Sequence, residues 1–171
     1  MNEQERQLPE RLWLLSIALR SRGHRRLAVW VKRLNALLYH NSLPFNATVS
    51  PDVTFAHHGF GNIIHDRVVI GRRVKIFHHV TLAVRGRGEA KNRIVIEDDV
   101  RIGTGCVVLT RRGQDLRIGR GARLGAGVVV TGDVPPGVSV VAGRPEILTD
   151  RVEARLERLN RNFGPNSGFG E

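Results

Sequence analysis

The sequence predicts a mainly β protein, built as a triangular parallel β-helix. The chief observation is a period of six residues, which begins at Ile64 and places an aliphatic side chain at every sixth position of each uninterrupted run. The members of this aliphatic row are Ile64, Ile70, Ile76, Leu82, Ile96, Ile102, Val108, Ile118, Leu124 and Val130. Four positions after them comes a row of small residues, namely Val68, Val74, Val80, Val100, Cys106, Ala122 and Val128. Neither a helix nor an alternating strand produces this pattern.

Three such hexads explain the period if they make one coil of a prism. The aliphatic residue then points into the prism, and the small residue fills a corner. Each coil buries its apolar side only by stacking on the next coil, as in other solenoids. We therefore expect a β-helix domain over residues 46–147. Cys106 belongs to the small row, so we expect a core side chain rather than a nucleophile, and a single cysteine excludes an internal disulfide.

Length and charge limit the classes of partner. The chain has 171 residues, which suits one domain with terminal additions, and 27 Lys and Arg against 16 Asp and Glu give a net charge of +11. This charge favours anionic partners such as phosphorylated cofactors. The low aromatic content and the lack of a recognition motif speak against nucleic acid. We find no transmembrane segment and no signal-peptide core in the sequence, and we expect a cytoplasmic protein.

Residues 1–45 are predicted to form a helical N-terminal region. Apolar residues recur at helical spacing in two runs, separated by a break at Ser21-Arg22-Gly23. The runs are Leu8, Leu12, Leu15 and Leu19, and then Leu27, Trp30, Val31, Leu34, Leu37 and Leu38. A basic amphipathic pair of this kind can lie on an anionic membrane. We expect instead that it caps the open end of the β-helix or makes a subunit contact.

Two interruptions of the hexads are expected to carry function, since loops that leave a rigid scaffold often do. Residues 84–93 form a basic, glycine-containing loop between two members of the aliphatic row, and residues 109–117 form a shorter excursion. The coils end at the Val-Pro-Pro-Gly sequence of residues 134–137. Residues 148–171 are expected to form a short C-terminal helix and a flexible tail.

Histidines are concentrated in and just before the early coils, at His57, His58, His65, His78 and His79. Imidazole titrates near neutral pH, so the cluster indicates either a general base or a metal site. A metal site needs three converging ligands. In β-helix enzymes that hold zinc across a subunit interface, two histidines stand five positions apart, and this spacing does not occur here. We expect no metal.

Two stretches of the chain resemble the serine O-acetyltransferase family. The first is His57-His58-Gly59-Phe60-Gly61-Asn62-Ile63-Ile64-His65, followed by Val69-Ile70-Gly71, Val80-Thr81-Leu82 and the basic loop. The second runs from Leu124 to Val130 and continues through Val134-Pro135-Pro136-Gly137 to Ala142-Gly143-Arg144-Pro145. The resemblance implies a left-handed β-helix and a homotrimer, with acetyl-CoA in a groove between adjacent β-helices. It also implies acetyl transfer to the hydroxyl of a small-molecule acceptor.

The resemblance places the catalytic general base at His58, three positions before Gly61. His57 is the second candidate, because some short relatives have their histidine at that position. The base would remove the hydroxyl proton as the oxygen attacks the thioester carbonyl. A backbone N–H near the thioester would stabilise the oxyanion.

The chain departs from the family pattern at three places. His57 stands where the serine enzymes have Asp directly before the catalytic histidine, and Arg93 stands where a second family histidine is expected. The acidic partner of the base would fall near Thr48, where there is no carboxylate, and Asp52 is only a neighbour. These departures concern free serine as the acceptor more than acetyl transfer itself.

The resemblance also implies binding residues. Small residues would expose backbone amides to the pantetheine arm of acetyl-CoA, and these are Gly103, Thr104, Gly125 and Ala126. Cationic residues would bind the phosphates of acetyl-CoA, and these are Arg85, Arg87, Lys91, Arg144 and Arg151. His65, His79 and Arg93 are expected to contact the acceptor. Two alternatives stay open: a sugar or natural-product O-acetyltransferase, and a non-catalytic β-helix binding or scaffold protein.

Overall fold

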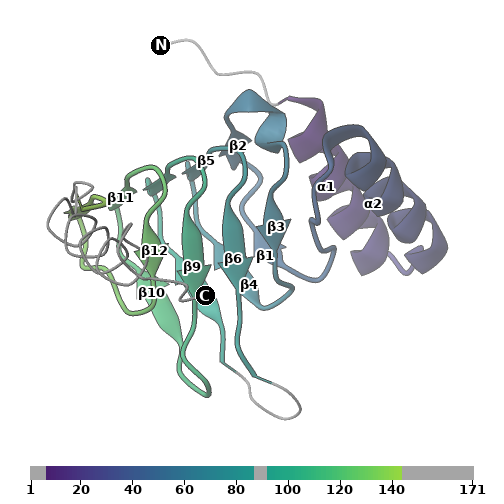
Figure 1. Cartoon of the computed structure of the whole chain (residues 1–171). Coiled ribbons are helices and arrows are strands. Elements are labelled where there is room, and N and C mark those ends of the chain that lie inside the picture. The colour runs from purple at the N-terminus through teal and green to yellow at the C-terminus, as the bar shows by residue number, and fades with distance from the viewer. Residues whose placement is uncertain (1–6, 87–91, 144–171) are drawn as a thin grey trace, which may run out of the picture.

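The computed structural model describes residues 7–86 and 92–143, and Figure 1 shows two helices at one end of a stack of short strands. Helix α1 spans Leu8–Ser21 and helix α2 spans Arg25–Tyr39. Gly23 lies between them with a φ of 87°, a value that favours glycine, so the predicted break between the helices is confirmed. Neither of these helices is long and apolar enough to cross a membrane.

The strands of the described chain form three parallel sheets, which we call the first, second and third faces of the β-helix. The first face contains β1 (Thr48–Val49), β4 (Val68–Ile70), β7 (Ile94–Ile96) and β10 (Leu116–Ile118). The second contains β2 (Thr54–Phe55), β5 (Lys75–Ile76), β8 (Arg101–Ile102), β11 (Arg123–Leu124) and β13 (Ser139–Val140). The third contains β3 (Ile63–Ile64), β6 (Thr81–Ala83), β9 (Val107–Leu109) and β12 (Val129–Val130). The chain visits the faces in this order once per coil.

Both rows of the hexad pattern lie in the core. Every member of the aliphatic row and of the small row is buried, and the coils stack in register, as where Ile76 pairs with Ile102 and Ile102 with Leu124. Stacking of like residues builds continuous apolar ladders inside the prism. The predicted β-helix architecture is therefore confirmed, and it is consistent with the left-handed form.

The corners of the prism require an unusual backbone. The residue before each small core residue adopts a positive φ at most turns, and glycine occupies this position in the later coils, as at Gly105 and Gly121. In the earlier coils the same position is taken by Arg73, His79 and Asp99, with φ values of 54°, 55° and 63°. Side chains other than glycine are strained there, so other contacts must hold these three turns.

Helix α1 closes the N-terminal end of the β-helix. It packs against β2 and against the short 3₁₀ turn η1 (His57–Gly59). The ring of Trp13 stacks on Phe55 at 5.8 Å, and its Nε1 donates to the carbonyl of Pro44 at 2.8 Å. The Glu10 carboxylate accepts a hydrogen bond from the backbone N–H of Phe55 at 2.5 Å. The predicted helical cap is confirmed.

The two helices do not bury the apolar rows that were found in their sequences. Helix α1 buries Pro9, Glu10, Trp13 and Ser16, while Leu8 and Leu15 are about half exposed. Helix α2 packs on α1 through Ala28 and Asn35, and the Asn35 side chain donates to the Pro9 carbonyl at 2.9 Å. Its apolar row faces solvent. We call the exposed residues Leu27, Trp30, Leu34, Leu37 and Leu38 the outer face of α2.

The two ends of the predicted basic loop are tied to the next coil. The side chain of Asn92 donates to the Arg85 carbonyl at 2.7 Å and to Thr110 Oγ1 at 3.0 Å. The Arg85 N–H donates to the same hydroxyl at 2.8 Å. Residues 87–91, the predicted C-terminal helix and the tail lie outside the described residues.

Candidate functional site

A strained turn presents the first two histidines. The chain leaves β2 and enters β3 through η1, where His57, His58 and Gly59 have successive φ values of 52°, 58° and 56°. Two adjacent non-glycine residues in the left-handed region cost free energy, and such strain is concentrated at functional sites. The turn is held from the cap, because the Gly61 N–H donates to the Tyr39 carbonyl at 3.1 Å.

His57 and His58 make contacts with different parts of the molecule. The His57 ring lies edge-on to the His78 ring at a centroid distance of 5.0 Å and is 6.2 Å from the Phe77 ring. The His58 ring instead stacks on Tyr39 of α2 at 6.0 Å, and its N–H donates to the Gln7 side chain. The His57 ring therefore contacts side chains of the β-helix, whereas the His58 ring contacts the helical cap.

The corner between the second and third faces gathers several of the predicted site residues. His78, Thr104 and Ala126 stand two positions after Ile76, Ile102 and Leu124, so they occupy equivalent places on successive coils. Thr104 Oγ1 is 3.5 Å from His78 Nδ1. We call His57, His78, His79, Thr104 and Ala126 the histidine corner.

The backbone of the histidine corner offers hydrogen-bond donors. Within the described chain, the N–H groups of His78, Thr104 and Ala126 donate to no protein acceptor, although the amides beside them do. His78 and Thr104 are half-buried and Ala126 is exposed, so water can satisfy these three N–H groups, and a ligand that replaces the water can use them. The row runs along the stacking direction, about 5 Å from one coil to the next.

The neighbouring corner, between the first and second faces, differs at two of its three equivalent positions, whereas the N–H of Asp98, at the third, also has no acceptor in the described chain. There the N–H of Arg72 donates to the Asp98 carboxylate at 2.8 Å, and the N–H of Arg120 donates to the Glu97 carboxylate at 2.8 Å. Acidic side chains of the protein thus fill the place that a ligand could take. The histidine corner carries His, Thr and Ala at these positions and leaves the donors open.

Gly103 and Gly125 do not provide the ligand amides that we expected. Their N–H groups already donate to the carbonyls of Leu124 and Val140, each at 2.8 Å. A Cβ on Gly103 would lie 2.8 Å from that Leu124 carbonyl oxygen. These glycines are therefore needed so that one coil can lie close to the next, and the available donors are those of Thr104 and Ala126.

His79 has a side chain that depends on a neighbouring glycine. Its ring lies against Gly61 so closely that a Cβ there would overlap the imidazole. The same ring is edge-on to Phe60 at 6.2 Å and to His78 at 5.3 Å. His79 is thus part of the histidine corner, and its contact with an acceptor stays a prediction.

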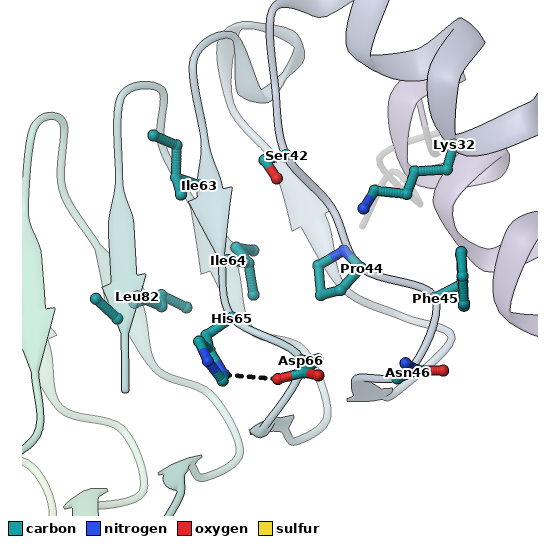
Figure 2. A pocket seen from close by; sticks show the side chains of 11 residues that line it. Lys32, Ser42, Pro44, Phe45, Asn46, Ile63, Ile64, His65, Asp66 and Leu82 are labelled. Carbon is teal, nitrogen blue, oxygen red and sulfur yellow. Dashed lines mark ion pairs between the residues drawn. The ribbon is translucent and has the colours of Figure 1, made fainter. Parts of the chain in front are cut away.

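His65 lies at a different corner. It follows β3, where the third face meets the first, and the length of a strand, on the order of 10 Å, separates it from the histidine corner. Its Nδ1 is 2.8 Å from Asp66 Oδ1. Figure 2 shows both side chains at an open pocket of about 420 Å³, with Lys32 and Phe45 on its opposite side. The structure therefore does not bring His65 together with His57.

The predicted cationic residues lie at the corner between the third and first faces, as His65 does, or outside the described residues. Arg85 and Arg93 flank the basic loop and are exposed, and Arg93 forms a long ion pair of 3.6 Å with Asp115. Arg87, Lys91, Arg144 and Arg151 lie outside the described residues. Within one chain, the described arginines of the loop are separated from the histidine corner by the third face.

Among the described residues, no ion pair joins a carboxylate to a side chain of the histidine corner. Asp52 receives a hydrogen bond from Ser50 Oγ at 2.6 Å. Burial acts to raise the pKa of Asp52, but hydrogen bonds from Ser50 and from the Arg73 backbone outweigh it and hold that pKa below its ordinary value. No ion pair joins Asp52 to His57 or His58 in the described chain. Over residues 7–86 and 92–143, no three His, Cys, Asp or Glu side chains come together as metal ligands.

Cys106 is a core residue, as predicted. Its side chain is fully buried and its Sγ donates to the Gly125 carbonyl at 2.7 Å. Burial raises the pKa of the Cys106 thiol, which keeps it protonated and poorly nucleophilic.

His78 also lies at the histidine corner, although it is not among the residues predicted to contact a ligand. It holds the same hexad position as Thr104 and Ala126, which are predicted binding residues. Position within the repeat is the sequence signal that groups these three residues.

The chain is similar in sequence and in structure to serine acetyltransferases. The chain is 33% identical over 170 residues to a serine acetyltransferase of Bacillus pumilus, with 80% of this chain and 76% of the relative covered. It is 43% identical over 91 residues to the serine acetyltransferase of Bacillus licheniformis, with 53% and 40% covered. A soybean serine acetyltransferase solved in complex with serine superimposes with a TM-score of 0.70 at 30% identity, over 82% of this chain and 56% of that one. The chain thus spans less than two thirds of two of these three proteins. No protein-family model matches the sequence.

Proposed function

Because the chain belongs to the serine acetyltransferase family, we propose that it transfers an acetyl group from acetyl-CoA to the hydroxyl of a small acceptor. The observation that supports this most directly is the histidine corner. There the ring of His57 lies edge-on to the ring of His78, and the backbone N–H groups of His78, Thr104 and Ala126 have no acceptor in the described chain.

The open donors suit the acetyl donor. The pantetheine arm of CoA is an extended chain with amide carbonyls, which accept hydrogen bonds from backbone N–H groups. The small side chains of Thr104 and Ala126 leave room for the arm along the corner. The thioester would then lie at the early coils, next to the histidines.

We assign the general base to His57 rather than to His58, since the His57 ring contacts the ring of His78 at the histidine corner, whereas the His58 ring stacks on Tyr39. His57 takes the proton of the acceptor hydroxyl as its oxygen attacks the thioester carbonyl. A nearby N–H, such as that of His78, stabilises the oxyanion. Collapse of the tetrahedral intermediate breaks the C–S bond, and His57 returns the proton to the CoA sulfur.

An assembly of several copies completes this site. The outward row of the third face is largely apolar, with Ile63 52% exposed, Val129 64% exposed, and Thr81 and Val107 between them. A face of this kind is suited to packing against another copy. In the proposed homotrimer, Arg85 and Arg93 of one copy would approach the histidine corner of the next, where Arg85 would face the phosphates of CoA and Arg93 the acceptor.

The acceptor is a small hydroxyl compound, with L-serine as the first candidate and a sugar as the second. A cytoplasmic location is part of the proposal, because the CoA thiol and the free Cys106 both suit a reducing compartment.

The test is thiol release from acetyl-CoA, measured with L-serine, with simple sugars and without acceptor. We expect His57→Ala to lower kcat by about 10²–10⁴-fold, the range typical of a lost general base. His58→Ala should retain most activity, and His24→Ala serves as a matched exposed control. An inactive His58→Ala with an active His57→Ala would move the base to His58. No turnover together with no CoA binding by calorimetry would reject the enzyme and favour a binding or scaffold role.

A further inference from the structure

We propose that the outer face of α2 binds the surface of an anionic lipid bilayer, with the helix lying in the plane of the interface. This function is separate from acetyl transfer and uses no residue of the histidine corner. It is carried by two observations on the helical cap: an exposed apolar row, and a charge of one sign around it.

The apolar row is large and continuous. The five residues of the outer face range from 46% exposed at Leu34 to 74% exposed at Leu37, and Trp30 is 68% exposed. With Leu8 and Leu15 of α1, the cap holds seven of the twelve large apolar side chains that are exposed in the described chain. Single exposed apolar residues are ordinary, but a contiguous patch marks an interaction surface.

In the described part of the cap, the charged side chains at the surface are all positive. Residues 7–43 contain one acidic residue, Glu10, which is buried against Phe55. The same segment holds seven cations, so its net charge is +6: Arg11, Arg20, Arg22, Arg25, Arg26, Lys32 and Arg33. Arg26 and Arg33 each stand four residues before an apolar member of the outer face, Trp30 and Leu37, and therefore border it on the helix surface.

This combination fits anionic lipid better than a second copy of the chain. Two caps packed through α2 would bring +6 against +6, and no exposed carboxylate of residues 7–43 is present to pair with Arg26 or Arg33. A leaflet with phosphatidylserine supplies the negative charge that the arginines lack, together with an apolar layer for the leucines. Trp30 suits the boundary between the two, where its ring is amphipathic.

The position of α2 allows a flat surface to reach it. Contacts join α1 to β2 and η1, whereas α2 packs mainly on α1. Figure 1 shows the helix pair at one end of the stack of strands. A bilayer against the outer face of α2 would therefore meet the cap and leave the later coils in water.

The test uses vesicles of phosphatidylcholine alone and of phosphatidylcholine mixed with phosphatidylserine, in co-sedimentation with the full chain. Trp30 is a built-in reporter, because the other tryptophan, Trp13, is buried. We expect binding to the mixed vesicles, a blue shift of the tryptophan emission, quenching by brominated lipid, and release by salt.

Two double variants and two matched controls make the test specific. R26E/R33E and L34E/L37E should each weaken vesicle binding by more than tenfold. The controls R111E/R112E and V141E change exposed residues of the same kinds on the β-helix, and should bind as the parent does. Thiol release and circular dichroism report whether each variant is folded.

Three outcomes would overturn the proposal. One is no binding to mixed vesicles by the folded parent protein. Another is a loss of binding in R111E/R112E as large as in R26E/R33E, which would indicate attraction by overall charge alone. The third is that L34E/L37E, without lipid, sediments as a smaller species than the parent; a second copy would then cover the face.

Discussion

Arg73 and Asp99 occupy equivalent corner positions on successive coils, and both have a positive φ, of 54° and 63°. Their side chains form a two-pronged ion pair, with Arg73 Nε 2.7 Å from Asp99 Oδ1 and Arg73 Nη2 2.8 Å from Asp99 Oδ2. The hydrogen bond from Arg73 holds the pKa of Asp99 below its ordinary value. The pair thus links two turns at a position where later coils have glycine.

Two replacements of Asp99 should separate the contribution of the ion pair to stability from the strain of the left-handed backbone. Asn tolerates the left-handed region, so Asp99→Asn loses only the ion pair, whereas Asp99→Ala also loses that tolerance. We expect Asp99→Ala to have the lower Tm of the two at neutral pH. Equal Tm values would show that the backbone at this corner is not strained.

Acid should remove the contribution of the same pair. The pKa of Asp99 is lowered in the folded protein, so its contribution is complete above the unfolded carboxyl pKa of about 4 and is lost as pH falls through the folded value. The Tm values of the parent and of Asp99→Asn, measured by thermal unfolding, should therefore converge as pH falls below about 4. A constant difference between them would contradict the assignment.

The cap should contribute strongly to stability through two side chains. Glu10→Ala leaves the buried Phe55 N–H without its acceptor, and we expect a loss of about 1–3 kcal/mol in the free energy of unfolding. Trp13→Ala removes a buried indole that stacks on Phe55, with an expected loss of about 3–5 kcal/mol. Denaturant unfolding followed by circular dichroism measures both. Arg11→Ala, an exposed neighbour on the same helix, should stay within about 0.5 kcal/mol of the parent.

Gly61 should control the position of His79. Gly61 and Gly113 share a positive φ, of 68° and 73°, but only a side chain at Gly61 would meet another group, the His79 ring. Gly113→Ala should cost about 1 kcal/mol of folding free energy for the backbone alone. Gly61→Ala should cost more and should raise the KM for the acceptor. An unchanged KM in folded Gly61→Ala would remove His79 from the acceptor site.

Cys106 should resist thiol reagents until the protein unfolds. Its side chain is fully buried and its pKa is raised, so both access and thiolate formation are suppressed. Labelling with a chromogenic disulfide should be slow in buffer and complete in denaturant. Fast labelling in buffer would mean that the coils around Cys106 open readily.

The hexad rows predicted the β-helix because each member has one role, which is to fill the prism. Every coil repeats that role, so the sequence alone identifies the core from Ile64 to Val130. The helices follow no such rule. The apolar spacing marked them correctly, yet α1 buries Glu10 and α2 buries Asn35, since the partners of these side chains come from Phe55 and Pro9, far away in sequence.

The sequence predicted which segments hold the candidate site, but not which contacts its residues make. The choice between His57 and His58 depends on a turn with consecutive positive φ values, and nothing in the sequence shows that His58 stacks on Tyr39. Likewise, the short motif around Gly103 did not reveal that its amide is already engaged.

The contact between Glu10 and Phe55 has a consequence beyond the single chain. A stack of parallel coils has no natural limit, and its first strand would offer open backbone groups to the strands of any other copy. Helix α1 takes up one of these donors through Glu10 and covers the Phe55 ring with Trp13. A strand of another copy could therefore pair with β2 at Phe55 only after α1 had been displaced.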